Sequence, residues 1–325
     1  MKTSSRSNLP LAGRNAPAAA HLLSLVFFLV GAPAVRAGDP FLWVSKAQCP
    51  LVRFEAAGGA AAGKLYQFSG FYTTNPIQAT TQCNAFDPVS NTWSPIAAIP
   101  QATTHAGQVA DTDQTGNHTF WLTGGFLGDH PGPTTNAVWK YSITNNTWAP
   151  GPNLPAPRAG GALMKLGRKL HFVGGVIRTD GVYAADYGTH WSLDLDNGTS
   201  WDATTANGQL LAPMPNPRNH MGGVALNGKL YAIGGQHKGD ETTGAQNEVD
   251  VYDPATNTWT QAAPMPRPIG HITANVFVRD GRIVVTSGVT SNSVEIANVI
   301  EYDPLTNTWS ELQPLPAARQ SPVSG

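Results

Sequence analysis

The sequence predicts an all-β protein in which one structural unit is built several times. The clearest sign is a recurring segment: "DVYDPATNTWTQAAPMP" at 250–266 returns as "EYDPLTNTWSELQPLP" at 301–316, with earlier versions at 86–100 and 141–155. The 34 glycines and 26 prolines disfavour helices, because both residues are poor in helix interiors. The 41% hydrophobic share is too high for a disordered chain. Short strands joined by Gly/Pro turns fit these observations best.

Two landmarks define five repeats of about fifty residues each. One is a tryptophan after a polar turn, and the other is a Gly pair, or Ser-Gly, after an apolar strand. The tryptophans are Trp93, Trp148, Trp201, Trp259 and Trp309. The pairs are Ser69-Gly70, Gly124-Gly125, Gly174-Gly175, Gly234-Gly235 and Ser287-Gly288.

Repeat four shows the predicted unit best. Residues 218–235 hold two apolar runs around Asn227-Gly228, a strong hairpin signal. Residues 247–266 alternate, turn at Asp253-Pro254 and return through Trp259, and proline suits that turn. Each repeat is therefore expected to form four antiparallel strands. The Gly pair would admit a neighbouring backbone, and the tryptophan would fill the gap between adjacent sheets.

This pattern resembles the Kelch repeat, in its double glycine, its tyrosine (Tyr252, Tyr302) and its tryptophan. The resemblance covers about residues 40–325 and implies a β-propeller, whose blades bury one another's faces around an axis. Repeat one departs through Ser69 and Phe86, repeat three through "THWSLDLDNGTSW", and repeat five through Ser287.

The two ends predict an incomplete sixth blade beside five full four-stranded blades. Residues 39–50 look like the end of a repeat, with Trp43 as its tryptophan, and residues 315–325 look like the start of one. Closing the ring by joining both termini in one blade is implied by the resemblance. We expect the chain to continue beyond residue 325 and complete this blade. The alternative is a five-bladed ring with trailing termini.

Residues 1–37 are predicted to be a secretory signal peptide, which leaves 38–325 as the propeller domain. Basic residues precede the apolar run "LLSLVFFLV" at 22–30, and Val35 and Ala37 precede the expected cleavage site. That run is shorter than a membrane span, although an uncleaved anchor is the alternative.

Cleavage leaves 16 basic against 21 acidic residues, a net charge of −5, and no basic patch for nucleic acid. We expect a secreted monomer that does not stay in the membrane. Three sequons fit secretion: Asn117, Asn145 and Asn197.

The candidate ligand-binding residues come from the first strand of each repeat, which is expected to line the central channel. The register of His220 holds Glu55, His105, Gly160, His271 and Ser321 in the other repeats. The register two residues earlier holds four arginines: Arg53, Arg158, Arg218 and Arg319. Kelch relatives place binding residues around the channel mouth, so the resemblance points to these positions.

Three interpretations of these registers stay open. The arginines and histidines could form a polar recognition pocket for carboxylates, phosphates or sugar hydroxyls. Histidine and glutamate could hold a metal ion, but no local spacing such as HxH or HExxH supports one. The third interpretation is a set of structural hydrogen bonds. We predict the pocket, with no metal, no cofactor and no catalytic residue.

Two enzyme readings remain as alternatives. Secreted Kelch propellers of the copper radical oxidase kind use a Tyr-His neighbour pair, and none of the eight tyrosines here is followed by histidine. Other Kelch proteins isomerise sugars with acid/base residues in the channel, and Glu55 with His105 could act so. We expect instead a module that binds a protein or a carbohydrate at the channel mouth and nearby loops, chiefly 126–136, 176–190 and 236–247.

The two cysteines, Cys49 and Cys83, both fall in apolar registers of the first blade. A disulfide between them suits a secreted protein. Two buried thiols packed as small hydrophobic groups are the equal alternative.

Overall fold

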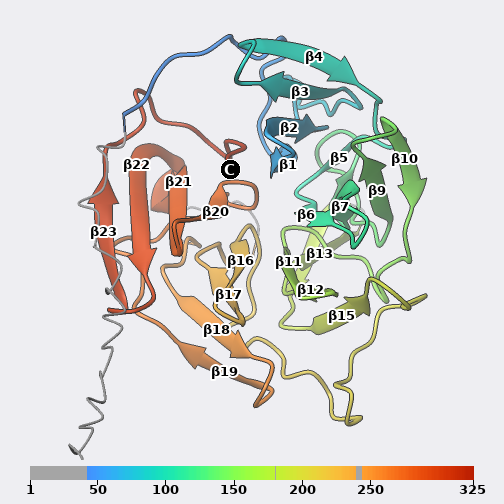
Figure 1. The fold of residues 1–325 in the computed structure, drawn as a ribbon. Coiled ribbons are helices and arrows are strands. Elements are labelled where there is room, and N and C mark those ends of the chain that lie inside the picture. Colours follow the sequence, from blue (N-terminus) through green and yellow to red (C-terminus); the bar gives the residue numbers. More distant parts are fainter. Residues whose placement is uncertain (1–41, 180, 239–243) are drawn as a thin grey trace, which may run out of the picture. The chain divides into compact units, whose positions relative to one another are not determined.

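The computed structural model describes residues 42–325 except 180 and 239–243. The predicted signal peptide lies outside these residues. The regular secondary structure of the described part consists of β-strands and one short 3-10 helix, η1 (Ser291–Ser293). No helix there is long and apolar enough to cross a membrane. Its sheets stand around a central axis like blades (Figure 1).

Four of the repeats form four-stranded antiparallel sheets within the described residues. Repeat one comprises β1 (Ala57–Ala61), β2 (Lys64–Phe68), β3 (Cys83–Asp87) and β4 (Thr92–Ile96). Repeat two comprises β6 (Gly107–Thr112), β7 (His118–Thr123), β9 (Val138–Ser142) and β10 (Thr147–Pro150). Repeat four comprises β16 (Gly222–Leu226), β17 (Lys229–Ile233), β18 (Val249–Asp253) and β19 (Thr258–Gln261). Repeat five comprises β20 (Val276–Arg279), β21 (Arg282–Thr290), β22 (Val294–Asp303) and β23 (Thr308–Leu312).

Repeat three differs from the expected four-stranded unit. Its sheet has three strands, β11 (Ala162–Leu166), β12 (Lys169–Val173) and β15 (His190–Asp194), and a single bridge, Ser192–Asp202, stands where a fourth strand would pair. This is the repeat whose turn reads "DLDNGTSW" in place of the usual Asp-Pro turn. Two small two-stranded sheets lie outside the blades: β5 (Thr103–Thr104) with β8 (Phe126–Leu127), and β13 (Val176–Thr179) with β14 (Val182–Asp186).

The first strand of each sheet lies innermost, as the sequence predicts (Figure 1). These strands line a channel of about 390 Å³, together with the C-terminal residues Ser324 and Gly325. Most of the lining side chains are small or apolar, and Gln108 reaches across the channel to donate a hydrogen bond to the carbonyl of Thr273.

The hydrophobic core lies between sheets rather than within one sheet. One cluster joins repeats one and two, with Phe68, Phe120 and Tyr141 in mutual ring contact. The glycine pairs permit this close approach: a Cβ on Gly124 would lie 2.2 Å from the carbonyl oxygen of Arg158 in the next repeat. Each sheet therefore stabilises the face of its neighbour, as the repeat pattern predicts.

The repeat tryptophans connect consecutive sheets through one recurring hydrogen bond. Each indole Nε1–H donates to a backbone carbonyl of the preceding repeat, at 2.8–2.9 Å. The pairs are Trp93 to Ala47, Trp148 to Ala97, Trp201 to Pro152, Trp259 to Ala212 and Trp309 to Ala263.

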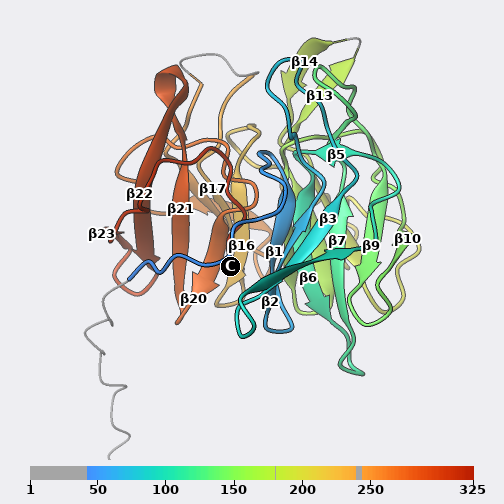
Figure 2. The ribbon, with the colours of Figure 1, turned by 90° about the horizontal axis from the view of Figure 1, so that it is seen from above.

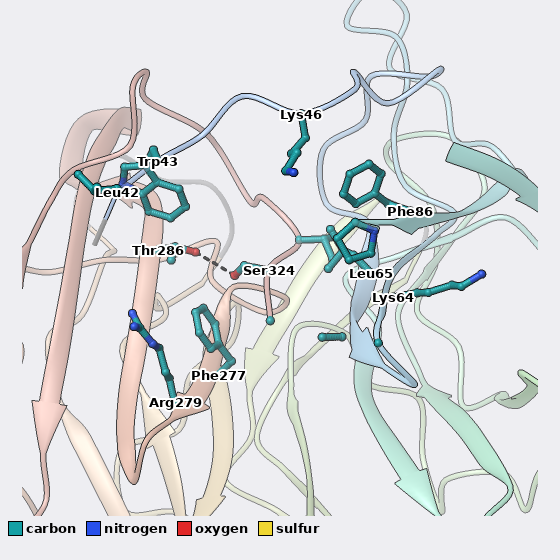
Figure 3. Close-up of a pocket in the computed structure, with 15 residues that line it drawn as sticks. Leu42, Trp43, Lys46, Lys64, Leu65, Phe86, Phe277, Arg279, Thr286 and Ser324 are labelled. Carbon is teal, nitrogen blue, oxygen red and sulfur yellow. Dashed lines mark hydrogen bonds between the residues drawn. The ribbon is translucent and has the colours of Figure 1, made fainter. Parts of the chain in front are cut away.

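The two terminal segments meet between the first and fifth sheets. Trp43 donates its indole N–H to the carbonyl of Gln313 at 2.9 Å, which is the same contact in the same register. Ser324 donates its backbone N–H to Ala274 and shares a hydrogen bond with Thr286 in repeat five. Beside them is a groove of about 800 Å³, with Trp43 and Phe277 on one side and Phe86 on the other (Figure 3).

Both cysteines are free thiols in the structure. Cys49 donates to the side-chain oxygen of Gln67 at 3.1 Å, and the buried Cys83 donates to the carbonyl of Thr81 at 3.5 Å. The described residues contain no Cys49–Cys83 bond, and of the two thiols only that of Cys83 is buried. Burial raises the pKa of the Cys83 thiol, which keeps it protonated and unreactive.

Candidate functional site at the channel mouth

The histidine register forms one cluster at the end of the channel where the innermost strands begin. Its described residues are Glu55, His105, His220 and His271, and their ligand-type atoms all lie within 4.8 Å of one another. All four side chains are buried, with His220 only 2% exposed. The sequence placed these residues in one register, and the structure gathers them at one point.

The backbone explains why each of these side chains is directed inward. The residue before each member pairs with a residue just beyond the second strand of its own sheet or, in repeat five, near the end of that strand. The pairs are Phe54 with Phe71, Thr104 with Phe126, Asn219 with Gln236, and Gly270 with Val289. The member itself then adopts a left-handed conformation before the innermost strand begins. All six register positions have φ between +47° and +65°, including Gly160 and Ser321.

Glu55 is the centre of the cluster. Its carboxylate accepts hydrogen bonds from Ser321 Oγ, at 2.6 Å, and from His271 Nδ1, and it lies 3.4 Å from His105 Nε2. Burial would raise the pKa of this carboxyl, but the charges of His105, His271 and His220 outweigh burial and hold the pKa well below its usual range. The carboxylate is therefore ionised at any ordinary pH.

The imidazole rings pack against one another at steep angles, with interplanar angles of 74° for His105–His220 and 58° for His220–His271. The His220 ring centroid lies 4.5 Å from that of His105 and 4.6 Å from that of His271. Phe71 and Phe126 approach His105 edge-on from the loops above. The four cluster residues line neither the channel nor the groove, and all four are buried.

The arginine register does not join this cluster. Arg218 is fully buried inside its own sheet, where it binds Asp250 at 2.5 Å and the carbonyls of Gly234 and Ala232. Arg53 occupies the same place in repeat one and binds the carbonyl of Gln82.

The other two arginines also lie away from the cluster. Arg158 lies over the rings of Tyr187 and Trp191, and desolvation lowers the pKa of Arg158 to about 10, opposed by Tyr187. Arg319 is exposed and donates to the carbonyl of Ala318. A spacing of two residues predicts a shared face in a regular strand, but the left-handed residue and its preceding bridge break that alternation here.

Loops of repeats one to four cover the cluster and are bonded to one another. Ala79 donates to the carboxylate of Asp129 at 2.8 Å, which joins repeats one and two. The backbone of Thr134 donates to the carbonyl of Arg178 at 3.1 Å, which joins repeats two and three.

The chain of contacts continues into repeat four. Asp186 accepts hydrogen bonds from the backbone N–H of Lys238, at 2.8 Å, and from the side chain of Asn219. Sequence reasoning identified the loops of repeats two to four but not that of repeat one, and it missed the cross-links, because a single Asp or Asn in a loop carries no signal of its partner.

The three sequons lie at exposed positions in turns: Asn117, Asn145 and Asn197. Asn117 is held by Asp113 and Thr115 in its turn. The sites are open to modification on steric grounds.

Comparison with known proteins agrees with this architecture. Kelch-like protein terF of Aspergillus terreus is 26% identical over 269 residues, which cover 80% of this chain and 54% of that protein. Human Kelch-like protein 33 is 30% identical over 156 residues, 47% of this chain and 26% of that protein. The chain thus spans about half or less of these relatives.

A solved structure shares the fold. The structure of YjhT aligns with a TM-score of 0.67 at 13% identity, over 84% of this chain and 88% of that chain. At this identity the likeness concerns the propeller-like fold alone. The model of the KLHDC2/KLHL20/DRC7 Kelch-repeats domain matches residues 114–324. Because that match includes well over half of the sequence, the chain belongs to the Kelch-repeat family.

Proposed function

We propose that this chain is a protein-binding module whose recognition surface is the face formed by the described residues of loops 69–82, 126–136, 176–190 (without 180) and 236–247 (without 239–243) and by the tip of the β21–β22 hairpin. We call this surface the loop face. Kelch-repeat domains typically bind proteins, and the relatives that match are Kelch proteins. The observation that carries the proposal is the series of hydrogen bonds that links the loops of four consecutive repeats.

These cross-links matter because a partner need not order the loops when it binds. Ordering loops and side chains on association costs free energy that would otherwise appear as affinity. A surface whose loops already hold one another in place avoids much of that cost. A rigid blade scaffold with bonded loops is therefore suited to recognition.

The loop face also presents apolar side chains at separate points. Tyr72 is 40% exposed, Val182 67% and Val294 53%, on the loops of repeats one, three and five. The β13–β14 hairpin and the tip of the β21–β22 hairpin project on the same side of the sheets (Figure 2). Exposed aromatic and apolar side chains of this kind can act as the few anchors that carry most of the energy of a protein interface.

The enzyme alternatives gain no support from this geometry. Glu55 and His105 are in contact, but both are buried and line neither of the two cavities described above. An acid/base pair needs a substrate within hydrogen-bond reach. We therefore favour binding over sugar isomerisation.

Two further features belong to the same proposal. We propose that the terminal segments occupy a sixth blade position and close the ring, supported by the Trp43–Gln313 and Ser321–Glu55 hydrogen bonds. We also retain secretion as a monomer, which rests on the sequence of residues 1–37 and on the three sequons.

The proposal is tested by mapping peptides selected from a display library on the purified protein. The variants Tyr72→Ala and Val294→Ala should weaken a selected peptide by about tenfold or more, since loss of an anchor costs over 1 kcal/mol. Val89→Ala and Leu305→Ala are matched controls, because both residues are exposed and apolar but lie in turns at the opposite end of the sheets.

Binding is measured by biolayer interferometry, with a glycan array screened in parallel. Peptides that lose affinity only in the Val89 or Leu305 variants would place the binding surface on the opposite face and refute the proposal. Glycans that bind the loop face while no peptide does would refute a protein partner.

A further inference from the structure

The cluster at the channel mouth is a complete donor set for a metal ion. Glu55 supplies carboxylate oxygens, and His105, His220 and His271 supply imidazole nitrogens, from four different repeats. Their ligand atoms lie within 4.8 Å of one another, and all four residues are buried. No distant side chain has to be recruited to assemble the site.

Neighbouring side chains orient two of the histidines as in metal sites. His105 Nδ1 lies 2.9 Å from Thr104 Oγ1, so its Nε2 is directed toward Glu55, at 3.4 Å from Oε2. His220 Nδ1 contacts the side-chain oxygen of Asn219 in the same way. A metal-binding histidine usually engages its second nitrogen with such a partner, which fixes the tautomer and the ring orientation.

The same four residues all adopt a left-handed backbone conformation, as does Ser321 in the same register. Glu55, His105, His220 and His271 all have φ between +51° and +56°. A left-handed conformation costs a residue with a side chain about 1–2 kcal/mol. Strained positions that persist together often mark functional sites. Glycine would relieve the strain, and Gly160 does so in the repeat that contributes no ligand.

We propose that Glu55, His105, His220 and His271 bind one Zn²⁺ ion on the axis of the blades. Three imidazole nitrogens and one carboxylate oxygen suit Zn²⁺, whereas Mg²⁺ and Ca²⁺ require more oxygen ligands. A buried set of four protein ligands corresponds to a closed, structural site.

The distances agree with tetrahedral coordination after a small adjustment. Ligand atoms about 2.0–2.1 Å from zinc stand about 3.3 Å apart in a tetrahedron. The His105–Glu55 separation of 3.4 Å already has this value. All the ligand atoms lie within 4.8 Å of one another, so those farther apart than about 3.3 Å would have to move closer together around the ion.

A bound ion would connect repeats one, two, four and five at a single point beneath the loop face. Binding to the folded chain alone stabilises it in proportion to the logarithm of ion concentration over Kd. The bound ion would therefore stabilise the arrangement of the sheets. The hydrogen bonds between the loops of the loop face do not involve the ion.

The test begins with metal content, measured by mass spectrometry on protein made without a polyhistidine tag and purified without chelator. Wild type should contain about one Zn²⁺ per chain. Glu55→Gln and His220→Ala should lower Zn²⁺ affinity by about 100-fold or more, since even loss of an orienting partner costs 10–100-fold. Removing the ion with chelator should lower the Tm of wild type, and ZnCl₂ should restore it.

Two control variants separate this site from other histidines. His237→Ala removes a surface histidine, and His171→Gln changes a buried histidine outside the cluster, so both should keep the ion. If Glu55→Gln does not fold, Co²⁺-loaded wild type is examined instead, where tetrahedral coordination gives strong visible absorption. Zinc-free wild type that ZnCl₂ does not stabilise, zinc lost in His237→Ala, or an octahedral Co²⁺ spectrum would each overturn the proposal.

Discussion

At the scale of single residues, an asparagine two positions before the tryptophan holds the turn in repeats one, two, four and five. Asn257 has a φ of +53°, and its side-chain oxygen accepts from the backbone of Ala212 at 2.9 Å and from Tyr252 Oη at 2.8 Å. Trp259 donates to the carbonyl of the same Ala212. One residue of the preceding repeat is thus held by both its N–H and its C=O, which satisfies both backbone groups.

Replacing this asparagine should cost more in repeat four than in repeat one. Asn257→Ala removes two accepted hydrogen bonds and one hydrogen bond donated to Leu210, and alanine tolerates the left-handed conformation less well than asparagine. We therefore expect the free energy of unfolding to fall by about 2–4 kcal/mol. Asn91→Ala should lower the free energy of unfolding by only about 1–2 kcal/mol. Asn91 accepts a hydrogen bond from the backbone N–H of Ala47, but repeat one has Phe86 where repeat four has Tyr252, so the tyrosine hydroxyl bond is missing. Urea denaturation measures both values.

The comparison includes its own control. Phe86→Tyr supplies the hydroxyl that repeat one lacks and should raise stability by up to about 1 kcal/mol. Equal losses for the two alanine variants would show that the tyrosine–asparagine hydrogen bond contributes nothing to stability.

At the scale of elements, the sequence predicts the strands well and the inward-facing residues only in part. Asn227-Gly228 forms the two-residue turn between β16 and β17, and Asp253 ends β18 as expected. These features follow from local turn chemistry. The arginine side chains do not join the histidine cluster, because the backbone turns at the left-handed residue two positions later. Of the residues in that left-handed register, only Gly160 carries a sequence signal for the conformation.

The pairing of β12 with β15 places two neutral histidines together in the core. His171 and His190 are 5% and 3% exposed, and their Nδ1 and Nε2 atoms lie 2.9 Å apart. His190 Nδ1 lies 3.3 Å from the carbonyl of Ala212, so Nδ1 carries the proton and Nε2 accepts from His171. Burial lowers the pKa of His171 to about 3, aided by His190 and Lys169, and burial lowers the pKa of His190 to about 4.

This pair should make the protein less stable as pH falls below the unfolded histidine pKa of about 6.5. In the window from 6.5 down to 3–4, the unfolded chain binds protons that the folded pair does not, so the free energy of unfolding decreases with falling pH. Each such group contributes up to about 1.4 kcal/mol per pH unit. His171→Gln should therefore reduce the slope of stability against pH between 6 and 4.5, measured by urea denaturation. An unchanged slope would mean that the pair is protonated in the folded protein.

At the scale of the whole molecule, the arrangement of sheets depends on contacts that repeat once per blade. The tryptophan bond, the glycine pair and the left-handed register residue recur at corresponding positions in the repeats. Such contacts are predictable from sequence because each is set by local spacing. The convergence of Glu55 and the three histidines at one point is not predictable in this way, because it depends on how many sheets surround the axis and on how the sheets tilt.

Closure of the ring predicts that a contact between the two termini stabilises the entire fold. Trp43 and Trp93 donate equivalent hydrogen bonds of 2.9 Å, to Gln313 and Ala47. Trp43→Phe and Trp93→Phe should each lower the free energy of global unfolding by about 1 kcal/mol with an unchanged dependence on urea. In a closed ring the Trp43 contact joins the first and last sheets, so its loss lowers the free energy of unfolding of the whole ring. In an open array the N-terminal segment would detach locally, and only Trp93→Phe would shift the global transition. A Trp43→Phe variant that matches wild type in urea would therefore argue for trailing ends.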